Sequence, residues 1–175
     1  MQNHNISILN PEKLRRANAK FVEHYADWAS HMLTLTFRND EKYSNPSQSQ
    51  IDRLLRHLRV DLNYDVWKKR TKYNAKAKIL FIPIVEGLNG NKQVHIHVLL
   101  GNIKEVLQLN MFVAQYVTRW PWLGYKYDIK DIYAADGLCW YLTKETHSIN
   151  TDAVRWEHSL IPSALIPKQH TLLYA

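Results

Sequence analysis

The sequence has a single cysteine and no apolar stretch long enough to cross a membrane. Among its 175 residues, Cys139 has no cysteine partner, which excludes an internal disulfide and fits a reducing compartment. The first residues lack the apolar segment of a secretory signal peptide, so we expect a cytoplasmic protein without a membrane partner. No low-complexity tract or internal repeat divides the chain. We therefore expect one domain over residues 1–175, with a core at 31–146 and an extension at 147–175.

Basic residues outnumber acidic residues, which fits a nucleic-acid partner. The 23 Lys and Arg residues against 16 Asp and Glu residues give a formal net charge of +7 and a pI near 9.4. In the turn Trp120-Pro121-Trp122, the ring of Trp122 is a candidate for stacking on unpaired bases. A solvated basic face and a ring that caps the core are the alternative interpretations. The candidates for binding DNA phosphates are Lys68, Lys69, Arg70 and Lys72.

The order of the periodic segments predicts an α+β protein with a ferredoxin-like antiparallel sheet. A β-α-β-β-α-β core follows a leading helix, and its strand order 4-1-3-2 places the strand with Pro83 at an edge, where proline is tolerated. Ser47-x-x-Gln50 is a capping box for the first core helix, and Asn102-x-x-Glu105 resembles a cap for the second. The expected elements are helices at 11–30, from the cap at Ser47 through Leu62, at 106–117 and at 137–145, and strands at 31–38, 79–86, 93–100 and 125–132.

The dipeptide Asn89-Gly90 predicts a hairpin between the second and third strands, because it is the strongest short hairpin signal. If it forms the centre of a two-residue turn, Glu86 pairs with Gln93 and Ile84 pairs with His95. Glu86 then shares the face of His95 and lies diagonal to it, at a backbone distance of about 7 to 8 Å. A carboxylate and an imidazole can meet on one ion at this spacing. The alternative is a strand-end glutamate that turns to solvent.

His95 and His97 are two residues apart in an apolar strand, so both imidazoles point to the same face. Imidazole is the commonest metal ligand among side chains, and Glu86 can add a carboxylate oxygen. This set suits Mg²⁺ or Mn²⁺ acting as a Lewis acid on a phosphate. With nine histidines, about 0.5 His-x-His pairs are expected by chance, so two hydrogen-bonded sheet histidines are the alternative interpretation.

Tyr-x-x-Lys occurs three times, but only a helix brings residues three apart to one face. Tyr127 lies in an alternating strand pattern and Tyr73 in a polar connection, so both are poor nucleophile candidates. Tyr141 and Lys144 lie in the expected helix 137–145, beside an inward stripe that begins at Leu138. The helix can therefore lie on the sheet and hold a phenol at the edge of a site. An aromatic ring that only packs in the core is the alternative for Tyr141, and a solvent-exposed side chain is the alternative for Lys144.

These residues resemble the HUH endonucleases, and among them the single-tyrosine rolling-circle replication initiators (Rep proteins), over most of residues 31–146. The tyrosine follows the histidine motif, as in replication initiators, whereas relaxases have the reverse order. Two features depart from the family pattern. No helicase segment or Walker A loop follows, and Glu145 stands where aspartate is common, which makes Glu145 an additional or alternative metal ligand. The matches to the strand, acidic, histidine and tyrosine motifs are, in order, Thr34-Leu35-Thr36-Phe37, Glu86, His95 with His97, and Tyr141 with Lys144.

The resemblance implies the HUH Rep fold and site-specific nicking of single-stranded DNA, in some cases at a hairpin, at the replication origin of a plasmid, phage or single-stranded DNA element in a prokaryotic host. Tyr141 attacks the scissile phosphate and leaves a 5′-phosphotyrosine and a free 3′-hydroxyl. Lys144 stabilises phosphate charge, Mg²⁺ or Mn²⁺ is the cofactor, and host replication proteins are further expected partners. A single-tyrosine HUH transposase and a non-catalytic basic DNA-binding module are the alternative functions.

Overall fold

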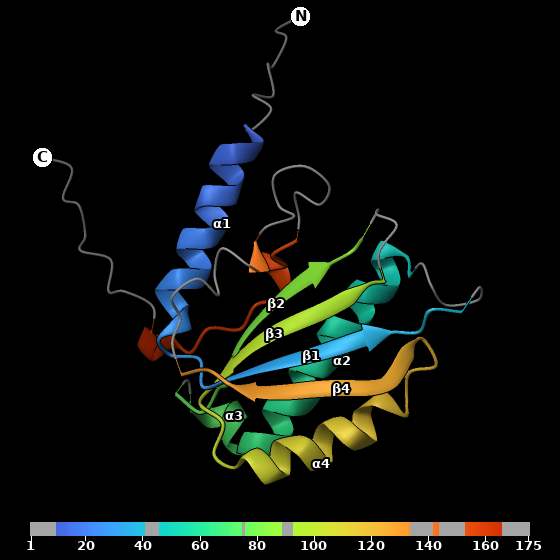
Figure 1. Ribbon diagram of the computed structural model, residues 1–175. Helices are drawn as coiled ribbons and strands as arrows, with labels where there is room; N and C mark the ends of the chain where they lie inside the picture. The colour runs from blue at the N-terminus through green and yellow to red at the C-terminus, as the bar shows by residue number, and fades with distance from the viewer. Residues whose placement is uncertain are drawn as a thin grey trace, which may run out of the picture.

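The computed structural model describes residues 10–40, 46–74, 76–88, 93–133, 142–143 and 153–165. Within these ranges four antiparallel strands form one sheet in the order β2-β3-β1-β4 (Figure 1). The predicted α+β class and strand order are confirmed, with the histidine strand inside the sheet and the Pro83 strand beside it. The strands are β1 (His31–Phe37), β2 (Leu80–Glu86), β3 (His95–Gly101) and β4 (Leu123–Asp131).

Two helices, α2 (Gln48–Trp67) and α4 (Val106–Val117), cover one face of the sheet. The predicted capping box begins α2, because Gln50 N donates to Ser47 Oγ at 3.3 Å and Ser47 N donates to Gln50 Oε1 at 2.7 Å. Figure 1 shows α2 behind the strands and α4 below β4. This face holds the larger core, in which the buried side chains include Leu33, Leu35, Phe37, Leu54, Leu58, Ile96, Val98, Val113 and Tyr116.

The cap predicted at Asn102 is wrong. Glu105 is the N-cap of α4, and its side chain makes no capping hydrogen bond. Asn102 follows the last residue of β3 with a φ of 56°, in the left-handed region that asparagine tolerates better than most residues. Its Nδ2 donates to the carbonyl of Lys78 at 2.7 Å. Asn102 therefore fixes the connection before β2 instead of the start of α4.

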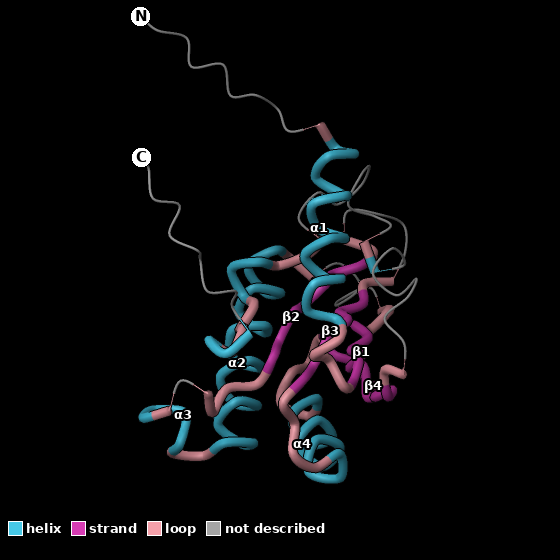
Figure 2. Tube along the Cα trace, turned by 90° about the vertical axis from the view of Figure 1, so that its left-hand side faces the viewer, coloured by secondary structure: helices cyan, strands magenta, loops and turns pink. Residues whose placement is uncertain are grey.

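The opposite face of the sheet carries α1 (Pro11–Ala26), which is capped by Asn10 and packs with its C-terminal half in a second, smaller core. Figure 2 shows α1 and α4 at opposite ends of the view, with the strands between them. α1 ends four residues before the predicted boundary, because Ser30 N already donates to the carbonyl of Leu100 in β3 at 2.8 Å. The short helix α3 (Arg70–Tyr73) was expected to be a connection. In the described ranges, no helix has both the length and the hydrophobicity needed to cross a membrane.

The described part of the C-terminal extension, residues 153–165, runs along the outer side of β2 and contains η1 (Trp156–His158) and η2 (Ser163–Leu165). Val85 N donates to the carbonyl of Ala153 at 2.8 Å, and Arg155 N donates to the carbonyl of Pro83 at 3.0 Å. Phe81 and Leu160 exchange two backbone hydrogen bonds at 2.9 and 2.8 Å. We call residues 153–160 the C-terminal segment. This segment pairs with the side of β2 on which Pro83 accepts a hydrogen bond but has no backbone N–H to donate.

Candidate active site

His95 and His97 lie at the start of β3 and point to the α1 face of the sheet, because they alternate with Ile96 and Val98 of the larger core. In the neighbouring strand β1, Thr36 is opposite His95 and Thr34 is opposite His97. The threonine Oγ1 atoms lie 3.2 and 3.0 Å from the respective Nδ1 atoms. The two imidazole rings are nearly parallel, with an interplanar angle of 19° and centroids 6.4 Å apart. Two threonine hydroxyls of β1 thus contact the Nδ1 atoms of both rings.

Glu86 is the last residue of β2 and completes the group on this face. Its Oε2 lies 3.2 Å from Nε2 of His97, and the two side chains are only 16% and 10% exposed. When Nδ1 of His97 carries the proton and donates it to Thr34, Nε2 presents a lone pair beside the carboxylate. When Nε2 carries the proton, it donates to Glu86. The pair is therefore compatible with a bound cation and with a direct hydrogen bond.

The predicted hairpin register is wrong by two residues. Glu86 pairs with His95, and Ile84 pairs with His97, so Glu86 is diagonal to His97 instead of His95. The connection is longer than a two-residue turn because its end pairs with β1: Phe37 N donates to the carbonyl of Val94 at 3.0 Å. Since a shift of two residues leaves each side chain on its original face, Glu86 still shares the face of both histidines.

The three side chains of the predicted metal site lie on one face of the sheet, but their ligand atoms do not all lie close to one another. Glu86 and His97 are in contact, whereas Glu86, His95 and His97 do not bring three ligand atoms within 4.8 Å of one another. A carboxylate oxygen and two imidazole nitrogens suit a hard or borderline divalent cation, so the chemistry of the donors fits. The His95 ring would have to turn to join the other two. The arrangement is a partly formed ligand set on a rigid sheet.

The predicted nucleophile Tyr141 lies outside the described residues, as do Lys144 and Glu145. The structure does describe Leu142, the residue that follows Tyr141, and Leu142 is 4% exposed. It belongs to the smaller core, which also contains Ile84 and Leu99. Ile84 is opposite His97 in the sheet, and Leu99 follows His97 by two residues on the same face of β3. The chain next to Tyr141 therefore packs on the histidine face.

The predicted DNA-binding residues lie away from the histidines. Lys68 and Lys69 follow α2, and Arg70 and Lys72 belong to α3, before the start of β2, whereas Glu86 ends that strand. β2 alone spans about 20 Å between these ends. Figure 1 shows α3 at the opposite end of the sheet from the tip of β1. All four side chains are exposed, and the ammonium of Lys68 lies 2.8 Å from Asp65.

Trp122 lies in the turn before β4, near the end of β1, since Arg38 N donates to its carbonyl at 2.8 Å. The ring is partly buried against the larger core and lies 5.0 Å from the ring of Trp120, centroid to centroid. The structure thus gives Trp122 a packing role on the helical face. It does not bring Trp122 together with the histidines.

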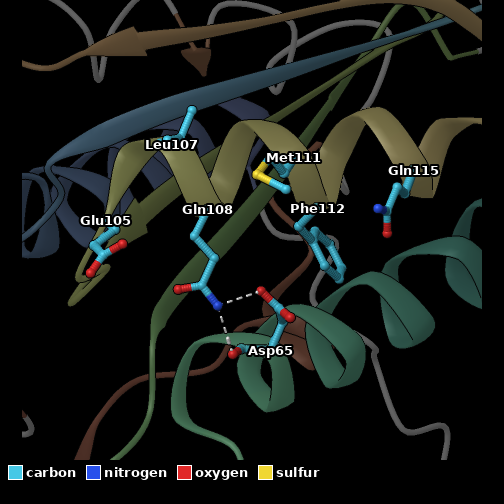
Figure 3. Close-up of a pocket in the computed structure, with 7 residues that line it drawn as sticks. All are labelled: Asp65, Glu105, Leu107, Gln108, Met111, Phe112 and Gln115. Carbon is cyan, nitrogen blue, oxygen red and sulfur yellow. Dashed lines mark hydrogen bonds between the residues drawn. The ribbon is translucent and has the colours of Figure 1, made fainter.

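A pocket of about 290 Å³ lies between α2 and α4, on the side of the sheet opposite the histidines (Figure 3). Apolar side chains of Leu107, Met111 and Phe112 line it, and Gln108 donates to the carbonyl and to Oδ2 of Asp65 at 3.0 and 2.9 Å. The hydrogen bonds to Asp65 join the two helices. Its lining includes no histidine, tyrosine or serine that could act as a nucleophile.

The sequence matched Thr34 and Thr36 to a strand motif but did not predict their contacts with the histidines. Thr34 and Thr36 alternate in β1 as His95 and His97 do in β3, and this matching period-2 spacing was the available signal. It also missed Asp128 of β4, which is opposite Thr34 and lies 3.1 Å from the ammonium of Lys130. Polar side chains thus extend across three neighbouring strands on this face.

Three comparisons bear on the identity of this arrangement. No protein-family model, no curated protein and no solved structure matches the chain.

Proposed function

We propose that the chain is a metal-dependent endonuclease of the HUH type, a Rep that nicks and rejoins single-stranded DNA through Tyr141. The observation that carries the proposal is the contact of Glu86 with His97, beside His95, on a sheet face where β1 holds both Nδ1 atoms. The strand order β2-β3-β1-β4 supports the finer assignment to a ferredoxin-like HUH Rep sheet. The biological role that follows is initiation of rolling-circle replication of a plasmid, phage or single-stranded DNA element.

Glu86, His95 and His97 would hold a divalent cation, Mg²⁺ or Mn²⁺, which supplies Lewis-acid polarisation of the scissile phosphate when bound. Contacts with Thr34 and Thr36 would fix the orientation of the two rings. When Nδ1 carries the proton and donates it to the threonine Oγ1, Nε2 keeps its lone pair for the cation. The side chains of Glu86 and His97, 16% and 10% exposed, are largely shielded from water.

Tyr141 is the proposed nucleophile. Its phenolic oxygen loses its proton and forms a bond to the phosphorus, the bond from phosphorus to the 3′-oxygen breaks, and that oxygen takes up a proton to leave a 3′-hydroxyl, so one proton is released and one is taken up. The packing of Leu142 against the core beside His97 supports this role, because Leu142 is the next residue in the chain. Free tyrosine has a pKa of about 10, so attack at neutral pH needs positive charge nearby. Lys144 is proposed to stabilise the phosphate, and Glu145 to be an additional ligand.

The basic residues at the other end of the sheet are proposed to bind DNA outside the nicked position. Lys69, Arg70 and Lys72 are exposed and close in sequence, which suits contacts to successive phosphates. Such contacts add affinity without selecting a sequence. The substrate would therefore extend from the histidine face to α3.

The test is formation of a covalent DNA adduct that survives denaturing detergent. The full chain is incubated with Mn²⁺ and with oligonucleotides that carry origin-like or element-end hairpins. Tyr141→Phe and His97→Ala should abolish the adduct. Tyr73→Phe is the matched control and should leave it unchanged, because Tyr73 is 80% exposed on α3. An adduct that persists in Tyr141→Phe overturns the assigned nucleophile.

One observation favours a second candidate, a non-catalytic DNA-binding module. The direct bond from Glu86 to His97 satisfies both side chains without a cation. This reading predicts DNA binding with no adduct on any oligonucleotide in Mn²⁺ or Mg²⁺. Adducts only with element-end hairpins would instead identify a single-tyrosine transposase.

A further inference from the structure

Three side chains on the other flank of β2 form a compact cluster that the proposed nicking reaction does not use. Asp52 belongs to the first turns of α2, and Glu157 and His158 belong to η1 of the C-terminal segment. Nε2 of His158 lies 3.1 Å from Oδ1 of Asp52 and 3.6 Å from Oε1 of Glu157. Among the described residues, these are the only three His, Cys, Asp or Glu side chains whose ligand atoms all lie within 4.8 Å of one another.

The spacing of these atoms matches that of ligands around one cation. Zinc binds histidine nitrogen and carboxylate oxygen at about 2.0 to 2.2 Å, which puts neighbouring ligand atoms of a tetrahedron about 3.4 Å apart. The two distances from Nε2 of His158 fall on either side of that value. Nitrogen with two carboxylate oxygens is also a donor set that borderline divalent cations accept.

Two carboxylate oxygens share one imidazole nitrogen in this cluster. A neutral imidazole has one N–H, whereas two carboxylate oxygens approach the same Nε2. The side chains of His158 and Asp52 are 9% and 28% exposed, so both are partly shielded from water. The side chain of Glu157 is 58% exposed, which leaves a route for an ion and for water ligands.

Neighbouring side chains hold the cluster in place. Gln48 Nε2 donates to Oδ1 of Asp52 at 3.1 Å, and Arg155 Nη2 donates to Oε1 of Gln48 at 2.9 Å. Metal-binding carboxylates are commonly oriented in this way by a second layer of hydrogen bonds. In the described ranges no ion pair or hydrogen bond joins Arg155 to Asp52 or Glu157.

We infer that Asp52, Glu157 and His158 form a second metal site, which takes a zinc-class divalent cation and fastens the C-terminal segment to α2. The inference does not rest on the proposed nicking activity. Asp52 and His158 are 106 residues apart in the chain, and the segment that carries His158 pairs with β2. A cation at this site therefore joins α2 to the C-terminal segment, which is itself paired with β2.

The experiment measures zinc binding by equilibrium dialysis in the full chain with His97→Ala, which removes the other candidate ligand set. This parent should bind one Zn²⁺ per chain. Asp52→Asn and Glu157→Gln, added separately, should weaken binding by at least about tenfold. Both changes keep side-chain volume, and circular dichroism checks the fold. His24→Ala, at an exposed position of α1, is the control and should bind as the parent does.

A second readout tests the fastening. At a hundredfold excess over its dissociation constant, Zn²⁺ should raise the Tm of the parent by about 5 to 10 °C. It should also slow tryptic cleavage after Arg155, and neither effect should occur in Asp52→Asn. A parent that takes up no zinc, or variants that bind as tightly as the parent, would overturn the metal site. Binding without protection of Arg155 would overturn the fastening. None of these results changes the adduct assay, which depends on Tyr141.

Discussion

Replacing Thr34 by valine should weaken both the fold and the candidate metal site, because it removes the hydroxyl that lies 3.0 Å from Nδ1 of His97. Valine has nearly the same shape, so the β1 backbone and its pairing with β3 should persist. His97 is 8% exposed, and water has little access to replace the lost partner. The change therefore removes the hydroxyl that contacts Nδ1 and leaves the contact of Nε2 with Glu86 in place.

The expected magnitude follows from that burial. A buried polar group left without a partner costs about 1 to 3 kcal/mol, which for a chain of this size lowers the Tm by roughly 2 to 12 °C. Loss of a hydrogen bond that orients a metal-binding histidine typically costs about 10- to 100-fold in metal affinity. The Mn²⁺ concentration for half-maximal adduct formation should rise by this factor.

The assay compares Thr34→Val with Thr71→Val, a half-buried threonine of α3 whose hydroxyl donates to the carbonyl of Lys68 at 3.1 Å. Thermal unfolding and adduct formation across a Mn²⁺ series give the two quantities. Thr71→Val should match the wild type in the Mn²⁺ series. If Thr34→Val leaves the Mn²⁺ requirement unchanged, the hydroxyl does not orient a metal ligand, and the reasoning about the tautomer fails.

Three further predictions address other parts of the molecule. Glu86→Gln should keep a hydrogen bond to His97 but lower adduct formation at limiting Mn²⁺ by at least about tenfold, and equal activity would remove Glu86 from the site. Burial raises the pKa of Tyr116 above its usual value of 10, so the stability that its neutral form provides is present below pH 10 and is lost as the pH rises through the higher folded pKa. Urea unfolding from pH 9 to 12 should show this loss in the wild type and not in Tyr116→Phe; parallel profiles would contradict it. The double change Lys69→Ala with Lys72→Ala should reduce the salt dependence of DNA binding by a slope of about 1.4, and an unchanged slope would exclude these phosphate contacts.

Local signals predicted the elements that depend on nearby residues. The capping box of Ser47 and Gln50 begins α2, and the period-2 spacing of His95 and His97 places both rings on one face. These features involve neighbours within a few positions, so the sequence shows them directly. The strand order followed from the sequence of elements, because few topologies join them with short connections.

Features that depend on distant partners were not predictable in the same way. The hairpin register changed because Val94 pairs with Phe37 of β1, and the cap at Asn102 failed because its amide bonds Lys78. The cluster of Asp52 with His158 joins positions that no periodicity relates. In both the hairpin and the cap, a hydrogen bond to a distant residue formed in place of the local hydrogen bond that the sequence pattern predicted.

The pairing of the C-terminal segment with β2 bears on how this protein avoids aggregation. Without the segment, the amides of Phe81 and Val85 would lose their acceptors, and a strand of largely apolar residues would be open along its length. Such strands recruit other chains into continuous sheets. Truncating the chain before Ala153 would thus favour self-association through β2, because the C-terminal segment covers this edge of the sheet.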